Sequence, residues 1–136
     1  MKRTAFLSLV ITFIATTLNA QDQTYADCVA KEKSTWGQPC AKCETYVEGF
    51  RRDFSGVFQI ELKNVCKETV EVKVAMQEQN GRWRTFPIKP LGAGESMNAF
   101  ACNGTGKYLY WVRRLNDTEI LIPSDQQILV EYKDRK

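Results

Sequence analysis

The cysteines are the residues whose type and spacing could most directly support chemistry. Cys40-Ala41-Lys42-Cys43 holds a pair of thiols separated by two residues, and Lys42 places a positive charge beside them. If this segment starts a helix, the unpaired backbone N–H groups there favour the thiolate of Cys40. A dithiol of this kind supports reversible thiol–disulfide exchange. Cys40 and Cys43 are therefore a candidate redox pair.

The residues that precede this pair, Trp36-Gly37-Gln38-Pro39-Cys40, resemble the approach to a thioredoxin-type active site. The resemblance covers eight residues and implies a redox function for the two thiols. The rest of the chain differs from that family, because no βαβ pattern surrounds the motif and antiparallel strand signals follow it. For an isolated Cys-x-x-Cys in a small exported chain, we favour structural bridging over redox catalysis.

Export is predicted from the amino terminus. Met1-Lys2-Arg3 is positively charged, residues 5–18 are mostly apolar, and a small residue, Ala20, stands before the polar Gln21. This layout is typical of a secretory signal peptide that is cleaved between Ala20 and Gln21. The apolar run is shorter than the roughly 20 residues that span a bilayer. We therefore expect a secreted or periplasmic protein with no membrane contact after cleavage.

Export changes how the cysteines are interpreted, because thiols outside the cytoplasm tend to oxidise. The simplest arrangement of the five cysteines is two disulfides and one free thiol. We predict a bridge between Cys66 and Cys102, because both fall at the ends of expected strands. Cys28 then pairs with Cys40 or Cys43, and the spacing does not select between the two.

The chain divides near Phe54 into two parts. Residues 21–53, after the signal peptide of residues 1–20, form a cysteine-containing N-terminal extension. Thr24 and Asp27 form a capping-box-like pair there, and the apolar residues that follow have helical spacing. A second short helix is expected over residues 41–48. An irregular loop is the alternative for both segments.

Residues 54–136 form an antiparallel β domain, because the apolar period changes to two. Apolar and polar residues alternate over 58–63 and 70–74. Asn80-Gly81 is typical of a two-residue hairpin turn that joins the strand over 70–78 to the next one. Further strands are expected over residues 96–102, 107–115, 119–122 and 127–132. About seven strands predict a mainly β fold, an antiparallel β-sandwich or a small barrel.

Composition excludes several function classes. The chain has no histidine, which removes the usual general base of serine and cysteine nucleophiles and the commonest nitrogen ligand of zinc. The formal net charge of +3 falls close to neutral once Lys2 and Arg3 leave with the signal peptide. A nearly neutral exported domain offers no electrostatic surface for nucleic acid. We expect no enzyme activity, no metal, no cofactor and no nucleic-acid partner.

Aromatic residues on the later strands are the other candidates for function. Tyr108 and Tyr110 alternate with Leu109 and Trp111, so both sides of that strand carry large apolar groups. One side must cover a core, and the other could face solvent as a ligand surface. Aromatic rings beside arginines suit sugar faces or peptides. The candidate ligand face is Trp83, Tyr108, Tyr110, Arg82 and Arg84; the alternative is that these rings complete the core.

The function that these observations favour is binding. We predict a small exported module that is stabilised by disulfides and binds a carbohydrate, a peptide or a cell-envelope partner. The first alternative is an extracytoplasmic thiol–disulfide redox protein that uses Cys40 and Cys43. The second is a secreted enzyme inhibitor that presents a loop such as residues 91–95.

Overall fold

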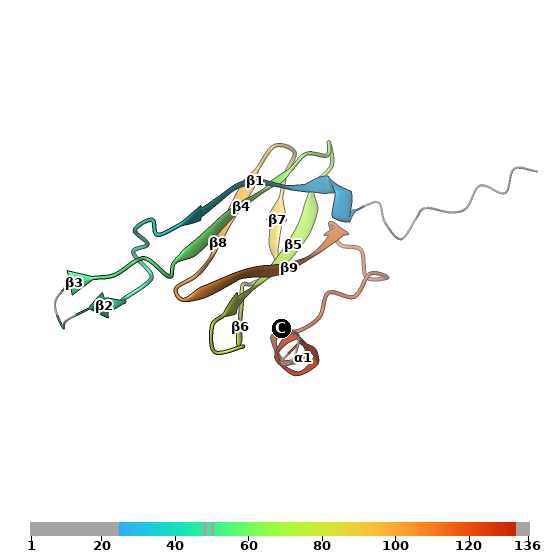
Figure 1. Cartoon of the computed structure of the whole chain (residues 1–136). Helices are drawn as coiled ribbons and strands as arrows, with labels where there is room; N and C mark the ends of the chain where they lie inside the picture. The colour runs from blue at the N-terminus through green and yellow to red at the C-terminus, as the bar shows by residue number, and fades with distance from the viewer. Residues whose placement is uncertain (1–24, 48, 50, 133–136) are drawn as a thin grey trace, which may run out of the picture.

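The fold is a sandwich of two antiparallel sheets with one short C-terminal helix (Figure 1). The computed structural model describes residues 25–47, 49 and 51–132. The expected signal peptide over residues 1–20 lies outside this range. The predicted mainly β sandwich is confirmed.

The first sheet has three strands, in the order β1 (Val29–Trp36), β4 (Phe58–Asn64) and β8 (Ser96–Ala101). A short 3₁₀ helix, η2 (Ala26–Cys28), leads into β1. A separate two-stranded ribbon, β2 (Tyr46–Val47) and β3 (Arg51–Arg52), projects from one end of the sandwich (Figure 1).

The second sheet has four strands and is built around β5 (Val70–Glu78). One edge of β5 pairs along most of its length with β9 (Gly104–Arg114). The other edge pairs with β6 (Trp83–Thr85) near its end and with β7 (Lys89–Leu91) near its start. A helix, α1 (Asp125–Glu131), lies against the side of this sheet that faces away from β1, β4 and β8 (Figure 1). Neither α1 nor any other helix in the described part of the chain combines the length and the apolar character needed to cross a membrane.

The period-two pattern predicts the inner faces of the sandwich correctly. Phe58, Ile60 and Leu62 of β4 are buried, as are the alternate valines of β5 that pack against them. Burial of these branched and aromatic side chains is the main favourable term that holds the two sheets together. The hairpin at Asn80-Gly81 is confirmed, but its turn is not the predicted two-residue one. The Glu78 N–H donates to the Arg82 carbonyl and the Gly81 N–H donates to the Glu78 carbonyl, so the loop has three residues, 79–81, and Gly81 supplies the left-handed φ of +82° at its end.

The predicted helices in the N-terminal segment are wrong. Residues 29–36 form β1, which pairs antiparallel with β4 from Val29–Asn64 to Trp36–Phe58. The second expected helix, over 41–48, is replaced by a turn at 41–42 and by β2, with residue 48 outside the described range. Local helical spacing is a weak signal, and pairing with β4 overrides it.

The predicted strands over residues 119–122 and 127–132 are also wrong. The second of them lies in α1, whose N-terminus is fixed by a capping box between Ser124 and Gln127. The Ser124 hydroxyl accepts the Gln127 backbone N–H, and the Gln127 side chain accepts the Ser124 backbone N–H. This reciprocal pair satisfies two N–H groups that a helix leaves unpaired, so the helix begins there.

The predicted bridge between Cys66 and Cys102 is wrong as well. The disulfides are Cys28–Cys66 and Cys43–Cys102, and Cys40 is a free thiol. The register of β4 and β8 gives the reason: Lys63 faces Ser96 and Phe58 faces Ala101. Cys66 and Cys102 therefore follow strands that run in opposite directions and lie at opposite ends of the sheet.

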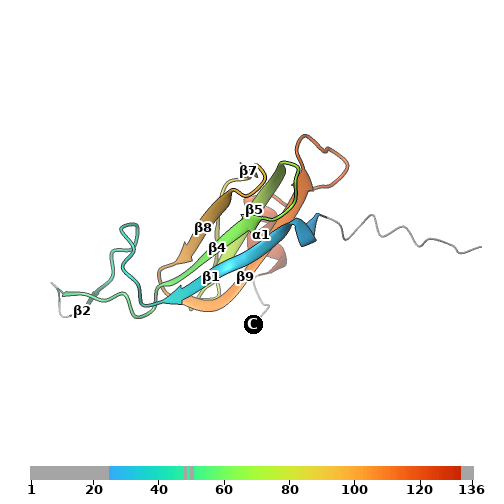
Figure 2. The same ribbon diagram turned by 90° about the horizontal axis from the view of Figure 1, so that it is seen from above.

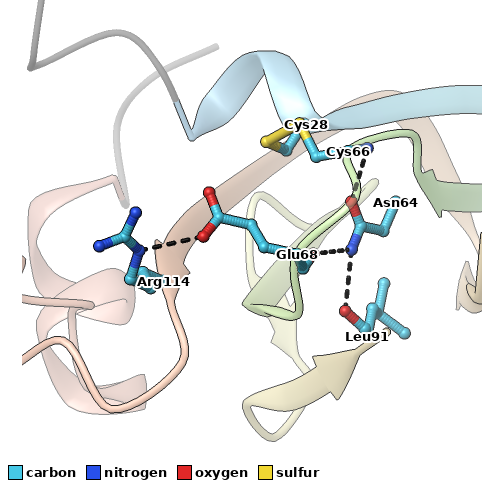
Figure 3. Close-up of a disulfide and its surroundings, with 6 residues drawn as sticks. All are labelled: Cys28, Asn64, Cys66, Glu68, Leu91 and Arg114. Carbon is cyan, nitrogen blue, oxygen red and sulfur yellow. Dashed lines mark hydrogen bonds and ion pairs between the residues drawn. A yellow bond between two sulfur atoms is a disulfide. The ribbon is translucent and has the colours of Figure 1, made fainter. Parts of the chain in front are cut away.

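A buried amide organises the turn beside the Cys28–Cys66 disulfide (Figure 3). Asn64 is completely buried, and its Nδ2 donates to the carbonyls of Glu68 (2.8 Å) and Leu91 (2.9 Å). Its Oδ1 accepts the backbone N–H of Cys66 at 2.9 Å. All of its side-chain hydrogen-bonding groups are thus engaged, and they join the β4–β5 turn to β7.

Candidate binding site

The predicted ligand face does not exist as one surface. Tyr108 and Tyr110 face the core between the sheets, on the same side of β9 as Val112. Trp83 lies on the opposite side of the four-stranded sheet, under α1. The alternation in β9 is as predicted, but each of its two sides is covered by a different layer. The prediction of a common face for Trp83, Tyr108 and Tyr110 is therefore wrong.

Trp83 belongs to a small second core beneath α1. Only 6% of its surface is exposed, and it packs with Ala75 of β5 and Ile128 of α1. Its Nε1 donates to the carbonyl oxygen of Tyr132 at 2.9 Å, and the Tyr132 ring meets it edge-on with centroids 6.3 Å apart. A buried indole with its N–H satisfied stabilises the docked helix. It offers little surface on which a sugar ring could stack.

Tyr108 and Tyr110 are half-buried along the margin of the sandwich. Their rings lie nearly parallel with centroids 6.3 Å apart. Lys31 of β1 places its Nζ 5.8 Å from the centroid of the Tyr108 ring. These tyrosines therefore close the side of the core where β1 and β9 lie next to each other.

Arg84 is held by partners within the chain. Its Nε lies 3.1 Å from Glu78 Oε1, and its guanidinium lies 5.1 Å from the centroid of the Phe100 ring. Phe86 meets Phe100 edge-on at 5.4 Å, and Lys42 Nζ lies 5.7 Å from the same ring. Sequence reasoning missed this group, because residues 42, 84 and 100 come together only through the Cys43–Cys102 disulfide and the sheet pairing.

Arg82 is the predicted ligand residue that lies best placed for a partner. It is exposed, and its guanidinium forms no ion pair with a residue in the described part of the chain. It stands between two shallow hollows. The hairpin–helix hollow is lined by Gly81, Arg82, Trp83, Gln126, Leu129 and Val130. The hairpin–disulfide hollow is lined by Glu78, Gln79, Asn80, Arg82, Trp83, Arg84, Cys102 and Asn103.

Apolar side chains remain exposed on the outer side of α1. Val130 is 67% exposed and Leu129 is 39% exposed, and both line the hairpin–helix hollow. They were not among the predicted site residues, because residues 127–132 were expected to form a strand. The sequence signal that could have found them is the Ser124–Gln127 capping box, which sets the helix and hence its outer face.

The position of α1 depends on an ion pair with the sheet. Lys73, with a side chain only 7% exposed, places its Nζ 2.6 Å from Asp125 Oδ1 in the first turn of α1. The hydrogen bond from Lys73 lowers the pKa of Asp125, with burial opposing it and the Lys73 charge and the Thr85 hydroxyl adding to the effect. The helix that lines the hollow is thus anchored at its N-terminus by charge and at its centre by Ile128.

The predicted redox pair is not a dithiol. Cys43 is 1% exposed and is bonded to Cys102, which leaves Cys40 as the free thiol. The backbone N–H of Cys43 donates to the carbonyl of Cys40 at 3.0 Å, so the motif forms a turn in place of the start of a helix. The expected activation of the Cys40 thiol required a helix that starts at this residue, and the structure has a turn there.

The loop considered for an inhibitor is a tight turn that is tied to the core. The side chain of Glu95 accepts the backbone N–H of Gly92 at 3.1 Å, and the Gly94 backbone N–H donates to the carbonyl of Asn64 at 2.9 Å. This loop is therefore fixed by the same turn that holds the buried Asn64 amide.

Comparisons with known proteins add no family to this picture. No protein-family model, no curated protein and no solved structure matches the chain. The two disulfides are typical of an oxidising extracellular compartment.

Proposed function

We propose that the chain is an exported interaction module that binds a protein segment in the hairpin–helix hollow and catalyses no reaction. The observation that carries the proposal is the exposure of Leu129 and Val130 next to Arg82. An apolar pair beside an unpaired guanidinium, on a rigid frame, is a common composition for a protein-binding surface.

The chemistry of the hollow indicates what it binds. Leu129 and Val130 provide apolar contact for an aliphatic or aromatic side chain, and Trp83 lines the hollow beside them. Arg82 supplies directional hydrogen bonds for a carboxylate beside that side chain. Burial of Trp83 favours such a segment over a sugar, because only 6% of the residue is exposed for stacking. The partner is thus a peptide segment with an apolar residue next to an acidic one.

Three carboxylates of β5 and of the turn before it are held in ion pairs, which supports binding over catalysis. Glu68, Glu71 and Glu78 each pair with an arginine: Arg114, Arg113 and Arg84. These three carboxylates are therefore already engaged by partners within the chain. Together with the absence of histidine from the sequence, this supports a non-catalytic module.

The test is a selection from a phage-displayed random peptide library on the immobilised, oxidised protein without its signal peptide. We expect enriched peptides to place an apolar residue beside Asp or Glu. Binding of a synthetic enriched peptide should weaken by about tenfold or more in Val130→Asp and in Arg82→Glu, as expected for contacts at the centre of an interface.

Leu121→Asp is the matched control, because Leu121 is 85% exposed and lies outside the hollow. This variant should bind the peptide like the unmodified protein. The proposal is wrong if no peptide is enriched, or if Leu121→Asp weakens binding as much as Val130→Asp does.

A further inference from the structure

We propose a second interaction surface: the free edge of β9 accepts an extended, acidic segment of a partner protein as an additional strand of the four-stranded sheet. This surface is independent of the hairpin–helix hollow. It is carried by the direction of the β9 backbone groups, by the regularity of the strand and by the charges beside it.

The hydrogen-bond pattern of β9 fixes which backbone groups point outward. The Leu115 N–H donates to the carbonyl of Thr69 at 3.4 Å, which makes Thr69–Leu115 a hydrogen-bonded pair. In an antiparallel ladder, such pairs alternate with non-bonded pairs. In the register of β5 and β9, Leu109, Trp111 and Arg113 therefore bond to β5. The backbone N–H and C=O groups of Tyr108, Tyr110 and Val112 consequently point away from the sheet.

Within the part of the chain that the structure describes, β5 is the strand that pairs with β9, so the outward groups have no strand beside them. Figure 2 shows β9 along the margin of the sandwich, next to β1 of the other sheet. The register with β5 runs without a shift from Val70–Arg114 to Met76–Tyr108. A long and regular edge of this kind is a ready template for another strand.

The neighbouring edge, β1, is protected in its middle, whereas the register shift of β9 lies at its start, before Tyr108. Its pairing with β4 shifts between Lys31 and Lys33, and Lys31-Glu32-Lys33 puts charge on the strand. A bulge and charged side chains are the usual means by which a sheet edge resists addition of a strand. The corresponding stretch of β9, from Tyr108 to Val112, is aromatic and aliphatic and has no bulge.

The charges beside β9 indicate an acidic partner. Lys107 is exposed on β9 and forms no ion pair within the described residues, and Lys31 lies over Tyr108. A second copy of this chain is disfavoured, because a two-fold pairing centred on Tyr110 would set Lys107 directly opposite Arg113. Like charges at facing positions destabilise a strand pair. Acidic residues on an added strand would instead face these lysines.

The test uses a synthetic peptide in which Glu alternates with Thr and Val, and a matched peptide with Lys in place of Glu. Hydrogen exchange followed by NMR reports on each amide. The acidic peptide should slow exchange at Tyr108, Tyr110 and Val112 and leave Leu109 and Trp111, which already bond to β5, unchanged. The lysine peptide should give no protection. Protection on β1, or equal protection by both peptides, would overturn the proposal.

Two variants separate this surface from the hollow. Lys107→Glu should weaken binding of the acidic peptide by about tenfold, since it reverses the charge beside the edge. Tyr110→Pro should abolish binding, because proline removes an outward N–H while no bond to β5 is lost; Tyr110→Val is its control and should bind. Val130→Asp should bind as the unmodified protein does. If Lys107→Glu binds unchanged, or if the protein forms dimers through β9 in sedimentation, the proposal is wrong.

Discussion

Lys73 Nζ lies 2.6 Å from Asp125 Oδ1, and this contact joins the middle of β5 to the first residue of α1. Lys73 lies on the side of β5 that faces away from the main core. Its ammonium group can be buried there because α1 covers it and Asp125 of α1 pairs with it. A buried charge needs a partner of this kind, because transfer from water is costly without one. The ion pair therefore helps to hold the helix over Trp83.

Asp125→Asn should lower the free energy of unfolding by about 1–2 kcal/mol, because Lys73 keeps its burial but loses the opposite charge. Chemical denaturation followed by tryptophan fluorescence measures the loss. Glu131→Gln is the control on the same helix and should change the free energy by less than about 0.5 kcal/mol. Equal effects of the two substitutions would show that the contact with Lys73 is unimportant.

Stability should decrease in acid partly through the same carboxyl group. The hydrogen bond from Lys73 lowers the pKa of Asp125 below its ordinary value of 3.8 in the folded protein. A lowered pKa means that the unfolded chain binds the proton more readily, so this stabilisation is present above the unfolded pKa and is lost as the pH falls through the folded one.

The measurement is the difference in unfolding free energy between the unmodified protein and Asp125→Asn at several pH values. The difference should be constant near neutral pH and should shrink below about pH 4. Asp53 also has a lowered pKa, caused first by the backbone N–H of Ser55, and it contributes equally in both proteins. A difference that stays constant into acid would contradict the assignment to Asp125.

The two disulfides should contribute similar stability but protect different parts of the chain. Their sequence separations are 38 and 59 residues, and the loop-closure model assigns each about 4 kcal/mol. The pairs Cys28→Ser/Cys66→Ser and Cys43→Ser/Cys102→Ser, both in a Cys40→Ser background, allow the comparison without exchange. Denaturation should show losses that differ by less than about 1 kcal/mol.

Removal of Cys43–Cys102 should additionally increase hydrogen exchange in residues 37–47 and 51–56, because that bridge ties these residues to the end of β8. Mass spectrometry of a non-reduced digest provides the direct check of connectivity. Peptides joined as Cys28–Cys66 and Cys43–Cys102, with Cys40 open to alkylation, are expected. A Cys66–Cys102 peptide would contradict the structure.

Asn64→Asp should destabilise the fold by about 2 kcal/mol or more, although the two side chains have the same size. The substitution replaces the Nδ2 donor by an oxygen that faces the carbonyls of Glu68 and Leu91. A buried acceptor without its donor loses the hydrogen bond and keeps the desolvation cost. Denaturation measures the loss, and Asn98→Asp, at an exposed position of β8, is the control.

The sequence predicts the elements that depend on neighbouring residues better than those that depend on contacts between distant residues. Ile60 and Val72 alternate with polar residues, and Asn80-Gly81 requires a specific turn, so β4, β5 and the hairpin follow from neighbouring residues. Residues 127–132 have the aliphatic and aromatic composition of a strand after the turn at residues 123–125, and that composition favours the wrong element. The capping box before them was the stronger local signal.

The candidate site needed information that no local pattern contains. The alternation of Tyr110 and Trp111 placed their side chains on opposite sides of the strand correctly. It could not indicate that α1 returns to cover Trp83, because that contact joins residues 49 positions apart. The pairing of Cys66 depends likewise on strand order, because the pairing of β1 with β4 brings Cys28, the residue before β1, beside Cys66.

One further property of β9 follows from its two apolar sides. Tyr108 and Tyr110 enter the core between the sheets, while Leu109 and Trp111 pack under α1. A slip of β9 by one residue would exchange these two sets and would still bury large rings on each side. Hydrophobicity alone therefore leaves two alignments of this strand almost degenerate.

The ion pairs at its end remove that degeneracy. Arg113 binds Glu71 and Arg114 binds Glu68, and a one-residue slip would turn each guanidinium toward the wrong side of the sheet. These partly exposed contacts add little net stability. They instead fix the register of β9 on β5, so that a strand whose hydrophobic pattern fits two alignments has one native alignment.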